Sequence, residues 1–455
     1  MKKTTFIYSL SVLLFVLITN HIQAQITPFH AYNDHYELYR TRFEPAYLGN
    51  NGKKFEANLM FNFNLWAGNN FMKVSTINAF ASNNLTNSLV EQALGDMRST
   101  DNRIGLGLSV QWLSAKFRAD NTFGEEIATF SFEINERFDA SMSFSKNIAE
   151  FLWYGNKRFA GQNINLGGFY PNMLAYREFV LGGARDVLNN GTLRLRAAVR
   201  LKYLVGIAAA RTESSNFIVN TAPDGSYIDF SVGYKAQYAN ANEEFSYKRA
   251  GGGFGTDLGI TATYQENLKV SLSVLDIGSI NFNQNTGGYE RRDTTFRFDG
   301  ILVNTSGVSS NNSNNVIDSL QNIITGKEIK GGSFSQKLPT RLSLQAEYTL
   351  PSGTENAHHF FFTYIQGFSD IGLASRRPFF SLGYVYQIRN QLNLGLTPSW
   401  GGYNNLSLGS FISYAAGPFR VGFGTNNLMS LISFSQGKSF DLTFNLGFNI
   451  SQKTD

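Results

Sequence analysis

The sequence predicts an all-β fold, a transmembrane antiparallel β-barrel of about 14 strands, within roughly 12–16, with short helices in its long loops. Residues 192–206 alternate between apolar and charged side chains almost without error. After residue 24 there is no run of the roughly 18 apolar residues that a membrane helix needs. Hydrophobic residues make up 42% of the chain and charged residues 16%, which suits a wall with one apolar face and one polar face.

Residues 192–206, TLRLRAAVRLKYLVG, give the clearest strand. The apolar side chains from Leu193 to Val205 fall on one face, and four cations fall on the other: Arg194, Arg196, Arg200 and Lys202. A period of two indicates a strand with two different faces. At about 3.3 Å per residue, it crosses an apolar band about 25 Å tall even when tilted by about 45°. We expect the apolar face to meet lipid and the charged face to meet a watery lumen.

The first 24 residues have the features of a cleavable secretory signal. Lys2 and Lys3 precede the apolar run at residues 6–18, which is too short to cross a bilayer, and cleavage is expected after Ala24. In a chain without a membrane helix, only a closed barrel satisfies every backbone polar group in lipid. These features together predict a protein of the bacterial outer membrane, with membrane lipid as its first partner.

Two further features exclude other classes of protein. The chain contains no cysteine, so it has no disulfide, no thiolate metal site and no lipid-modified N-terminal cysteine. Its net charge of +5 is mild and is not gathered in the dense basic patch that nucleic-acid binding requires. We therefore expect no nucleic-acid partner.

Further strands follow from the same alternation, taken in chain order. The first is residues 55–66, with apolar residues alternating with Glu56 and asparagines. Residues 86–94 read as a short helix inside a long connection at 67–101, and residues 141–172 are irregular and partly helical. The segment 173–183 is expected to pair with 192–206 through the turn Asn189-Asn190-Gly191. The other strands expected in this half of the chain are 103–112, 127–135, 226–239, 254–265 and 268–275.

The second half is interrupted once and then becomes regular. Residues 279–337 form the largest break, in which 304–315 is polar and of low complexity, with a strand expected at 294–303 and a short helix at 316–325. From residue 339 onward the strands are about ten residues long. They are expected at 340–350, 357–367, 378–388, 391–398, 405–415, 417–425 and 440–450.

The domain organisation that follows is simple. Residues 1–24 are the signal peptide, residues 25–54 an N-terminal segment that could form a hatch in the lumen, and residues 55–455 one barrel. No internal repeat and no second domain emerge. The two long connections, 67–101 and 279–337, are the places where other envelope proteins would bind, because loops of that length usually carry function or are disordered.

Several stretches resemble an uncharacterised family of outer-membrane barrels from Bacteroidota, similar to fatty-acid-transporter-like (FadL-type) barrels. The resemblance is strongest at a hairpin motif that reads GFGTDLG at 253–259 and LSVLDIG at 272–278. Similar stretches are 200–206, 338–341, 417–419 and 425–428. The resemblance implies a barrel in the outer membrane and implies no activity. Its motif residues mark strand ends and turns: Gly253, Gly255, Asp257, Gly259, Asp276 and Gly278.

The basic stripe of Arg194, Arg196, Arg200 and Lys202 has two interpretations. It could attract an anionic solute, because a channel with low-dielectric walls concentrates the field of like charges. Alternatively, it is an ordinary lumen wall neutralised by acids on neighbouring strands, with Glu178 and Asp229 as candidate partners. The second interpretation is favoured, and it predicts that a barrel with all four cations replaced by Gln still folds.

No arrangement of residues predicts an enzyme, a cofactor or a metal site. Residues 251–255 are glycine-rich, but a strand follows them and not the helix that a dinucleotide loop requires. His30 and His35 lie on irregular chain, and alternation sends His358 and His359 to opposite faces of a strand, so no three or four ligands converge. The G-x-S-x-G pattern of a nucleophile elbow is not present.

Two functions remain. The first is passage or binding of a small hydrophobic or anionic solute at the outer membrane. The second is a non-enzymatic structural or assembly role in a secretion or cell-surface complex, through the long loops. A secreted β-sandwich is less consistent with this many long strands, because such a sheet would expose unguarded edges.

Overall fold

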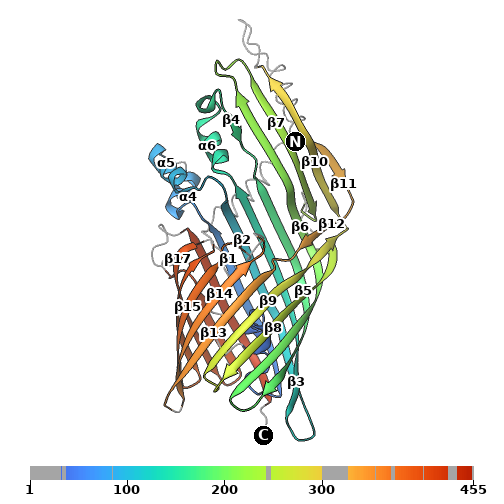
Figure 1. The fold of residues 1–455 in the computed structure, drawn as a ribbon, viewed down its shortest axis with the longest axis vertical. Helices are drawn as coiled ribbons and strands as arrows, with labels where there is room; N and C mark the ends of the chain where they lie inside the picture. Colours follow the sequence, from blue (N-terminus) through green and yellow to red (C-terminus); the bar gives the residue numbers. More distant parts are fainter. Residues whose placement is uncertain are drawn as a thin grey trace.

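A computed structural model of the chain describes residue 32 and residues 37–82, 84, 86–241, 247–299, 326–353, 355–369, 375–402, 404–428 and 438–452. The predicted signal peptide at 1–24 and the predicted helix at 316–325 lie outside these residues. No helix in the described ranges is long and apolar enough to cross a membrane. The fold is a closed antiparallel barrel with a tall sheet rising from one side of its rim (Figure 1).

Fourteen strands close the barrel, which confirms the predicted fold class and strand number. The ends meet where the last strand pairs with the first, from Phe55 opposite Gln452 to Gly68 opposite Ser439. In order around the wall the strands are β1 (Phe55–Asn69), β2 (Asn102–Asp120), β3 (Glu126–Phe144), β5 (Tyr170–Asn189), β6 (Leu193–Thr221), β8 (Gly251–Tyr264), β9 (Leu268–Phe282), β13 (Arg341–Ser352), β14 (Asn356–Gly367), β15 (Phe379–Ile388), β16 (Leu392–Gly401), β17 (Asn404–Ala416), β18 (Phe419–Thr425) and β19 (Ser439–Gln452).

The two ends of the barrel differ. At one end consecutive strands are joined by tight turns, such as the turn at 190–192 between β5 and β6, which confirms the predicted hairpin. At the other end the connections are long and carry helices. These are α4 (Val74–Ala81), α5 (Asn87–Asp96), α6 (Lys146–Tyr154) and the 3-10 turn η3 (Lys157–Phe159). The predicted helix at 86–94 corresponds to α5, whose cap residue Thr86 accepts a hydrogen bond from the Leu89 amide at 3.3 Å.

Two predicted strands belong to an extension and not to the barrel wall. Strand β6 is 29 residues long, and between Gly206 and Ala209 it exchanges its partner β8 for β7 (Ile228–Ala239). β7 pairs with β10 (Thr286–Phe298), and β10 pairs with β11 (Lys327–Lys330). The short β4 (Asn163–Asn165) pairs with the upper part of β6, and β12 (Phe334–Lys337) pairs with the end of β9. The extension stands above the barrel rim in Figure 1.

The faces of the wall follow the predicted alternation. On β6, Leu201 is 59% exposed on the outer face, whereas its neighbours Arg200 and Lys202 are buried in the interior. The outer face carries exposed leucines, valines and phenylalanines on every part of the wall, for example Leu181, Phe254, Leu382 and Leu446. Exposed tyrosines follow the tight-turn end: Tyr264, Tyr348 and Tyr414. Near the other end Phe380 stacks on Trp400, with ring centroids 5.4 Å apart.

Candidate gate in the barrel lumen and groove above it

The N-terminal segment lies inside the barrel, where it is buried and contacts wall strands on different sides of the lumen. It begins, within the described residues, with Tyr32 and continues from residue 37 through α3 (Glu37–Arg40) and the 3-10 turn η2 (Pro45–Tyr47) to the start of β1. Residues 37–49 are buried almost throughout, although none of them is part of the wall. We call residues 37–52 the lumen segment. The domain boundary predicted at residue 54 stays a prediction.

Glu37 ties the lumen segment to itself and to the wall. Its carboxylate accepts hydrogen bonds from the backbone amides of Gly49 and Asn51 at 2.8 and 2.9 Å. The same carboxylate lies 2.7 Å from the ammonium group of Lys116, which points inward from β2 and is fully buried. A buried carboxylate that receives two amides and one ammonium group is fully satisfied, so the loop at 47–51 is held closed against β2.

Arg40 makes the second set of contacts. Its guanidinium group donates to Glu44 within the lumen segment at 2.9 Å and to Glu347 of β13 at 2.7 Å, and it lies over the ring of Tyr47 at 3.6 Å. The Arg40 and Glu347 side chains are almost entirely buried. Removal of one partner from a buried ion pair leaves an uncompensated charge. Arg40 is therefore a structural anchor between the lumen segment and the far wall.

Tyr32 extends the contact surface to β14. Its hydroxyl lies 2.6 Å from the hydroxyl of Thr363, and its ring stacks on Phe361 with centroids 4.2 Å apart. Burial raises the pKa of Tyr32 to about 12, so the phenol keeps its proton at any physiological pH. The segment thus contacts strands on opposite sides of the lumen.

The basic stripe predicted from the sequence lies in the interior, and each of its cations is paired with acids. Arg194 contacts Asp186 at 2.8 Å, and Arg196 contacts both Asp186 at 2.7 Å and Glu126. Arg196 also donates to the carbonyl of Leu48 at 2.7 Å, which makes it an anchor of the lumen segment. The stripe therefore holds the lumen segment and is neutralised along its length.

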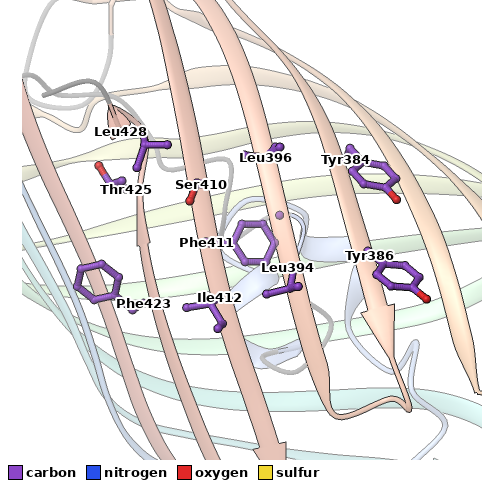
Figure 2. Close-up of a pocket in the computed structure, with 11 residues that line it drawn as sticks. Tyr384, Tyr386, Leu394, Leu396, Ser410, Phe411, Ile412, Phe423, Thr425 and Leu428 are labelled. Atoms are coloured by element: carbon purple, nitrogen blue, oxygen red, sulfur yellow. The ribbon is translucent and has the colours of Figure 1, made fainter. Parts of the chain in front are cut away.

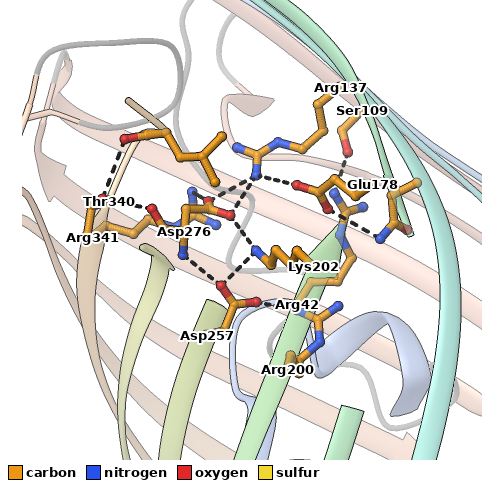
Figure 3. A network of polar contacts seen from close by, with 12 residues as sticks. Arg42, Ser109, Arg137, Glu178, Arg200, Lys202, Asp257, Asp276, Thr340 and Arg341 are labelled. Carbon is orange, nitrogen blue, oxygen red and sulfur yellow. Dashed lines mark hydrogen bonds and ion pairs between the residues drawn. The ribbon is translucent and has the colours of Figure 1, made fainter. Parts of the chain in front are cut away.

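Higher in the lumen the stripe joins a larger network, drawn in Figure 3. Arg200 lies 2.7 Å from both Glu133 and Asp257, and Lys202 lies 2.7 Å from Asp257 and 2.5 Å from Asp276. Glu133 in turn accepts a hydrogen bond from Thr41 of the lumen segment at 3.2 Å. The network connects the wall strands β3, β6, β8 and β9 across the interior.

Asp276 is the centre of this network. Its carboxylate oxygens form ion pairs with the side-chain nitrogens of three cations: Arg137 at 2.9 Å, Lys202 at 2.5 Å and Arg341 at 3.0 Å. The Asp276 side chain is 1% exposed. The Asp276 amide donates to Asp257 at 2.6 Å, and its φ of 57° is one that Asn and Asp tolerate better than other residues. One acid therefore serves three cations from three different strands.

The two acids expected to neutralise the stripe behave differently. Glu178 lies in the same network and contacts Arg137 at 3.3 Å. Asp229 lies in the extension, where it pairs with Arg297 at 2.7 Å, so it is not a partner of the stripe. The partners of the stripe are Asp186, Glu126, Glu133, Asp257 and Asp276.

These pairs change the expected outcome of replacing all four stripe cations by Gln. The sequence predicted an intact fold, whereas the structure predicts that Glu133, Asp257 and their neighbours lose their counter-charges while buried. We expect the free energy of unfolding in lipid vesicles to fall by at least about 3 kcal/mol, measured by urea titration. An unchanged unfolding midpoint would show that the stripe is solvated after all.

The hairpin motif lines the lumen and supplies two acids of this network, Asp257 and Asp276. On β8, Phe254, Leu258 and Ile260 are exposed on the outer face, so Gly253, Gly255, Asp257 and Gly259 face inward. A Cβ on Gly259 would lie 3.1 Å from Pro45 of the lumen segment, and one on Gly278 only 2.3 Å from the Phe254 carbonyl. The motif glycines therefore make room for the lumen segment and for close approach of β8 and β9.

An apolar groove of about 450 Å³ lies outside the lumen, between α6 and the extension. α6 contributes Ile148, Phe151 and Leu152, and the strands contribute Phe217, Val232 and Ala236. The remaining lining residues are Leu166, Phe169, Pro171, Thr212, Ser215, Asn216 and Tyr234. A concave apolar surface with few polar groups is the usual form of a small-molecule site.

A second hollow, of about 480 Å³, opens on the outer face of the wall (Figure 2). It lies where the short side chains Ser410 and Thr425 are neighbours across β17 and β18, beside Leu396. Its lining is part of the apolar outer band, and Figure 2 shows Leu394, Ile412 and Phe423 along its lower edge. The hollow therefore faces the surroundings of the barrel and not its lumen.

The histidines do not form a site with other ligands among the described residues. His358 and His359 lie on opposite faces of β14, as predicted, with His358 hydrogen-bonded to Tyr384 at 2.9 Å and His359 lying 3.3 Å from Glu347. His30 and His35 lie outside the described residues. No group of three possible metal ligands occurs in the part of the chain that the structure describes.

Sequence reasoning missed most anchors of the lumen segment. Glu133 and Glu347 lie on predicted strands, but nothing in their pattern singles them out, and Lys116 lies beyond the strand predicted at 103–112. Glu37 and Arg40 lie on a segment without a period, and no pattern identifies them. The groove was missed because the helical spacing of Ile148, Phe151 and Leu152 indicates an apolar helix face but does not show which strands that face lies against.

Comparisons with known proteins give one family and several distant structures. The toluene transporter TbuX of Ralstonia pickettii is 9% identical, with 92% of this chain and 94% of that chain covered and a TM-score of 0.42. A Pseudomonas aeruginosa FadL homologue is 9% identical, with 94% and 99% covered and a TM-score of 0.42. The CymD monoaromatic hydrocarbon channel is 11% identical, with 95% of each chain covered and a TM-score of 0.40. Such distant likenesses do not indicate a solute for this chain.

The remaining comparisons concern sequence. No curated protein matches the chain. Residues 45–426 match a family described as "Family of unknown function (DUF5723)". The match begins inside the lumen segment and extends through β18, so it includes both the network around Asp276 and the groove beside α6.

Proposed function

The chain belongs to the family of unknown function DUF5723, and from its own geometry we propose that it is an outer-membrane barrel for the passage or binding of a small hydrophobic solute. The observation that carries the proposal is the apolar groove beside α6, at the end of the barrel with the long connections. In outer-membrane barrels the long loops are extracellular and the tight turns periplasmic. The groove would therefore be open to the cell exterior.

The outer face of the wall supports a membrane location. Exposed leucines, valines and phenylalanines surround the barrel, and aromatic residues gather toward both ends of the strands. An apolar band between two aromatic girdles is the surface that such barrels present to lipid. The predicted signal peptide is consistent with export to the same location.

The charges in the lumen favour a hydrophobic solute over an anionic one. Each cation of the basic stripe contacts at least one carboxylate, and the best-buried of them, Arg200 and Lys202, contact two each. A cation that is already paired and desolvated has little field left for a passing anion. The groove, by contrast, offers apolar side chains that a small hydrophobic molecule could cover.

The lumen segment acts as the gate in this proposal. Residues 37–49 fill part of the interior and are held there mainly by ion pairs and hydrogen bonds: Glu37 with Lys116, Arg40 with Glu347, and Leu48 with Arg196. In this proposal, a solute that enters the lumen passes the lumen segment when these contacts rearrange. The closed state is the one described above.

The test is to fill the groove. We expect Ala236→Trp to reduce the binding of N-phenyl-1-naphthylamine to the protein in nanodiscs by at least about tenfold, because the indole would occupy the groove and about 1.4 kcal/mol of lost binding gives that factor. Fluorescence titration measures the dissociation constant. The matched control is Ser410→Trp, which places the same side chain in the hollow on the outer face.

Equal binding by wild type and Ala236→Trp, or no binding by wild type, would contradict the proposal. Co-purification of a stoichiometric envelope protein, together with no solute entry into liposomes, would instead favour the structural or assembly role. The extension β7–β10–β11 is the surface that would serve such a role, since it rises beyond the barrel rim (Figure 1).

A further inference from the structure

A polar hollow adjoins the apolar groove. It has a volume of about 470 Å³ and shares two lining residues with the groove, Ser215 and Asn216 of β6. The two hollows therefore border each other at this part of β6. A molecule that crosses this boundary would have one apolar part and one polar part.

The chemistry of the polar hollow is that of hydroxyl and amide groups. Its lining residues are Ser99, Thr100, Asp101, Ser143, Phe144, Ser145, Asn147, Asn165, Gly167, Gly168, Tyr170, Ser215 and Asn216. The lining contains one carboxylate and neither lysine nor arginine. Neutral hydroxyl and amide groups both donate and accept hydrogen bonds, so they match a ligand that also does both.

The single carboxylate in the hollow argues against an anionic ligand. Asp101 already pairs with Arg103 and, at 2.8 Å, with Arg377, and neither arginine lines the hollow. An anionic head group would enter beside the Asp101 carboxylate and would find no free cation among the lining residues. A cationic head group would compete with two arginines that are already in place. An uncharged head group avoids both costs.

Two residues at the N-terminus of α6, Ser145 and Asn147, line the polar hollow. The Ser145 hydroxyl is buried and makes no hydrogen bond within the described residues, and it does not cap α6. The Asn147 amide nitrogen donates to the Asn165 carbonyl at 3.1 Å, so the Asn147 side chain is held at the edge of the hollow. A buried hydroxyl without a partner is costly unless a ligand or water satisfies it.

We propose that the groove and the polar hollow form one binding site for an amphipathic molecule with an apolar chain and an uncharged, hydroxyl-rich head group, the chemistry of an alkyl glycoside or the end of a glycolipid. The chain lies between α6 and β7, against Phe151, Phe217 and Val232. The head group lies beyond Ser215, among the hydroxyl and amide groups near Ser145. This binding site shares one assumption with the proposed function, namely that the groove beside α6 binds apolar groups.

The experiment compares two ligands with the same chain. Octyl β-D-glucoside and sodium octanoate, each far below its critical micelle concentration, are used to displace N-phenyl-1-naphthylamine from the wild-type protein in nanodiscs. We expect the glucoside to displace the probe at a concentration at least about tenfold lower than octanoate, because two or three added hydrogen bonds give about that factor. Equal potency, or a preference for octanoate, would overturn the proposal.

Variants separate the head-group site from the groove. Ser145→Ala removes a hydroxyl that makes no hydrogen bond in the described structure, and Thr100→Val replaces a second hydroxyl without a change of shape. We expect the double variant to weaken the glucoside about tenfold and to leave the naphthylamine dissociation constant unchanged. An unchanged glucoside affinity would overturn the proposed head-group site but would not contradict binding of apolar molecules in the groove. Failure of the naphthylamine to bind the wild type would overturn the proposed function as well.

Discussion

Arg40→Met is expected to open the barrel. The substitution leaves the carboxylates of Glu44 and Glu347 buried without the guanidinium that joins them at 2.9 and 2.7 Å. Breaking a buried ion pair in this way costs about 3–5 kcal/mol, and this cost falls on the state in which the lumen segment is in place. The population of the displaced state should rise by two orders of magnitude or more, because about 1.4 kcal/mol corresponds to a factor of ten. Single-channel recording in planar bilayers measures the open fraction.

The control is Arg297→Met, which removes an arginine from an exposed ion pair with Asp229 in the extension. A surface pair is worth about 0–1 kcal/mol, so this variant should conduct as the wild type does. Heat-modified migration on a gel separates a displaced lumen segment from an unfolded barrel. A folded Arg40→Met protein with the conductance of the wild type would show that the lumen segment is not the gate.

Asp276→Asn is expected to be the most destabilising single change in the wall. Arg137, Lys202 and Arg341 share the Asp276 carboxylate, and an amide cannot balance their charge. Asn is nevertheless compatible with the positive φ at this position, so the variant isolates the loss of charge from backbone strain. We expect the free energy of unfolding in lipid vesicles to fall by about 3–5 kcal/mol, measured by urea titration.

Asp229→Asn is the matched control for this change. It makes the same chemical substitution in an ion pair that is exposed and lies outside the network, so its effect should stay within about 1 kcal/mol. If the two variants unfold at the same urea concentration, the network around Asp276 does not stabilise the barrel. The naphthylamine affinity of both variants should equal that of wild type, since neither residue lines the groove.

The wall was predictable from the sequence because alternation is a local property. Each barrel strand has a lipid face and a lumen face. The face on which Leu201 or Arg200 lies can therefore be predicted from the alternation alone, without knowing which strand pairs with β6. The same property explains the main error. The strands predicted at 226–239 and 294–303 also rest on alternation, and the pattern does not distinguish a strand of the wall from a strand of the extension.

The interior was less predictable because it depends on contacts between residues far apart in the chain. The pairing of Arg40 with Glu347 spans 307 positions, and no local pattern joins an irregular segment to a strand. The sequence indicates the basic stripe and favours its neutralisation, but its contacts with Glu126 and Asp186 emerge only from the register of β3, β5 and β6. The hairpin motif was found as a pattern, whereas its use as room for Pro45 required the structure.

The length of β6 has a mechanical consequence. One unbroken strand carries Arg196 and Arg200 at its lower end and Thr212, Ser215 and Phe217 of the groove at its upper end. β6 carries an extra residue in each ladder near the place where it leaves the wall: Ile207 in the ladder with β5 and Glu213 in the ladder with β7. Irregular pairing is where a strand bends. The bend therefore sets the direction in which the upper sheet leaves the wall beside the groove, while the lower half of the same strand stays paired with its neighbours in the barrel.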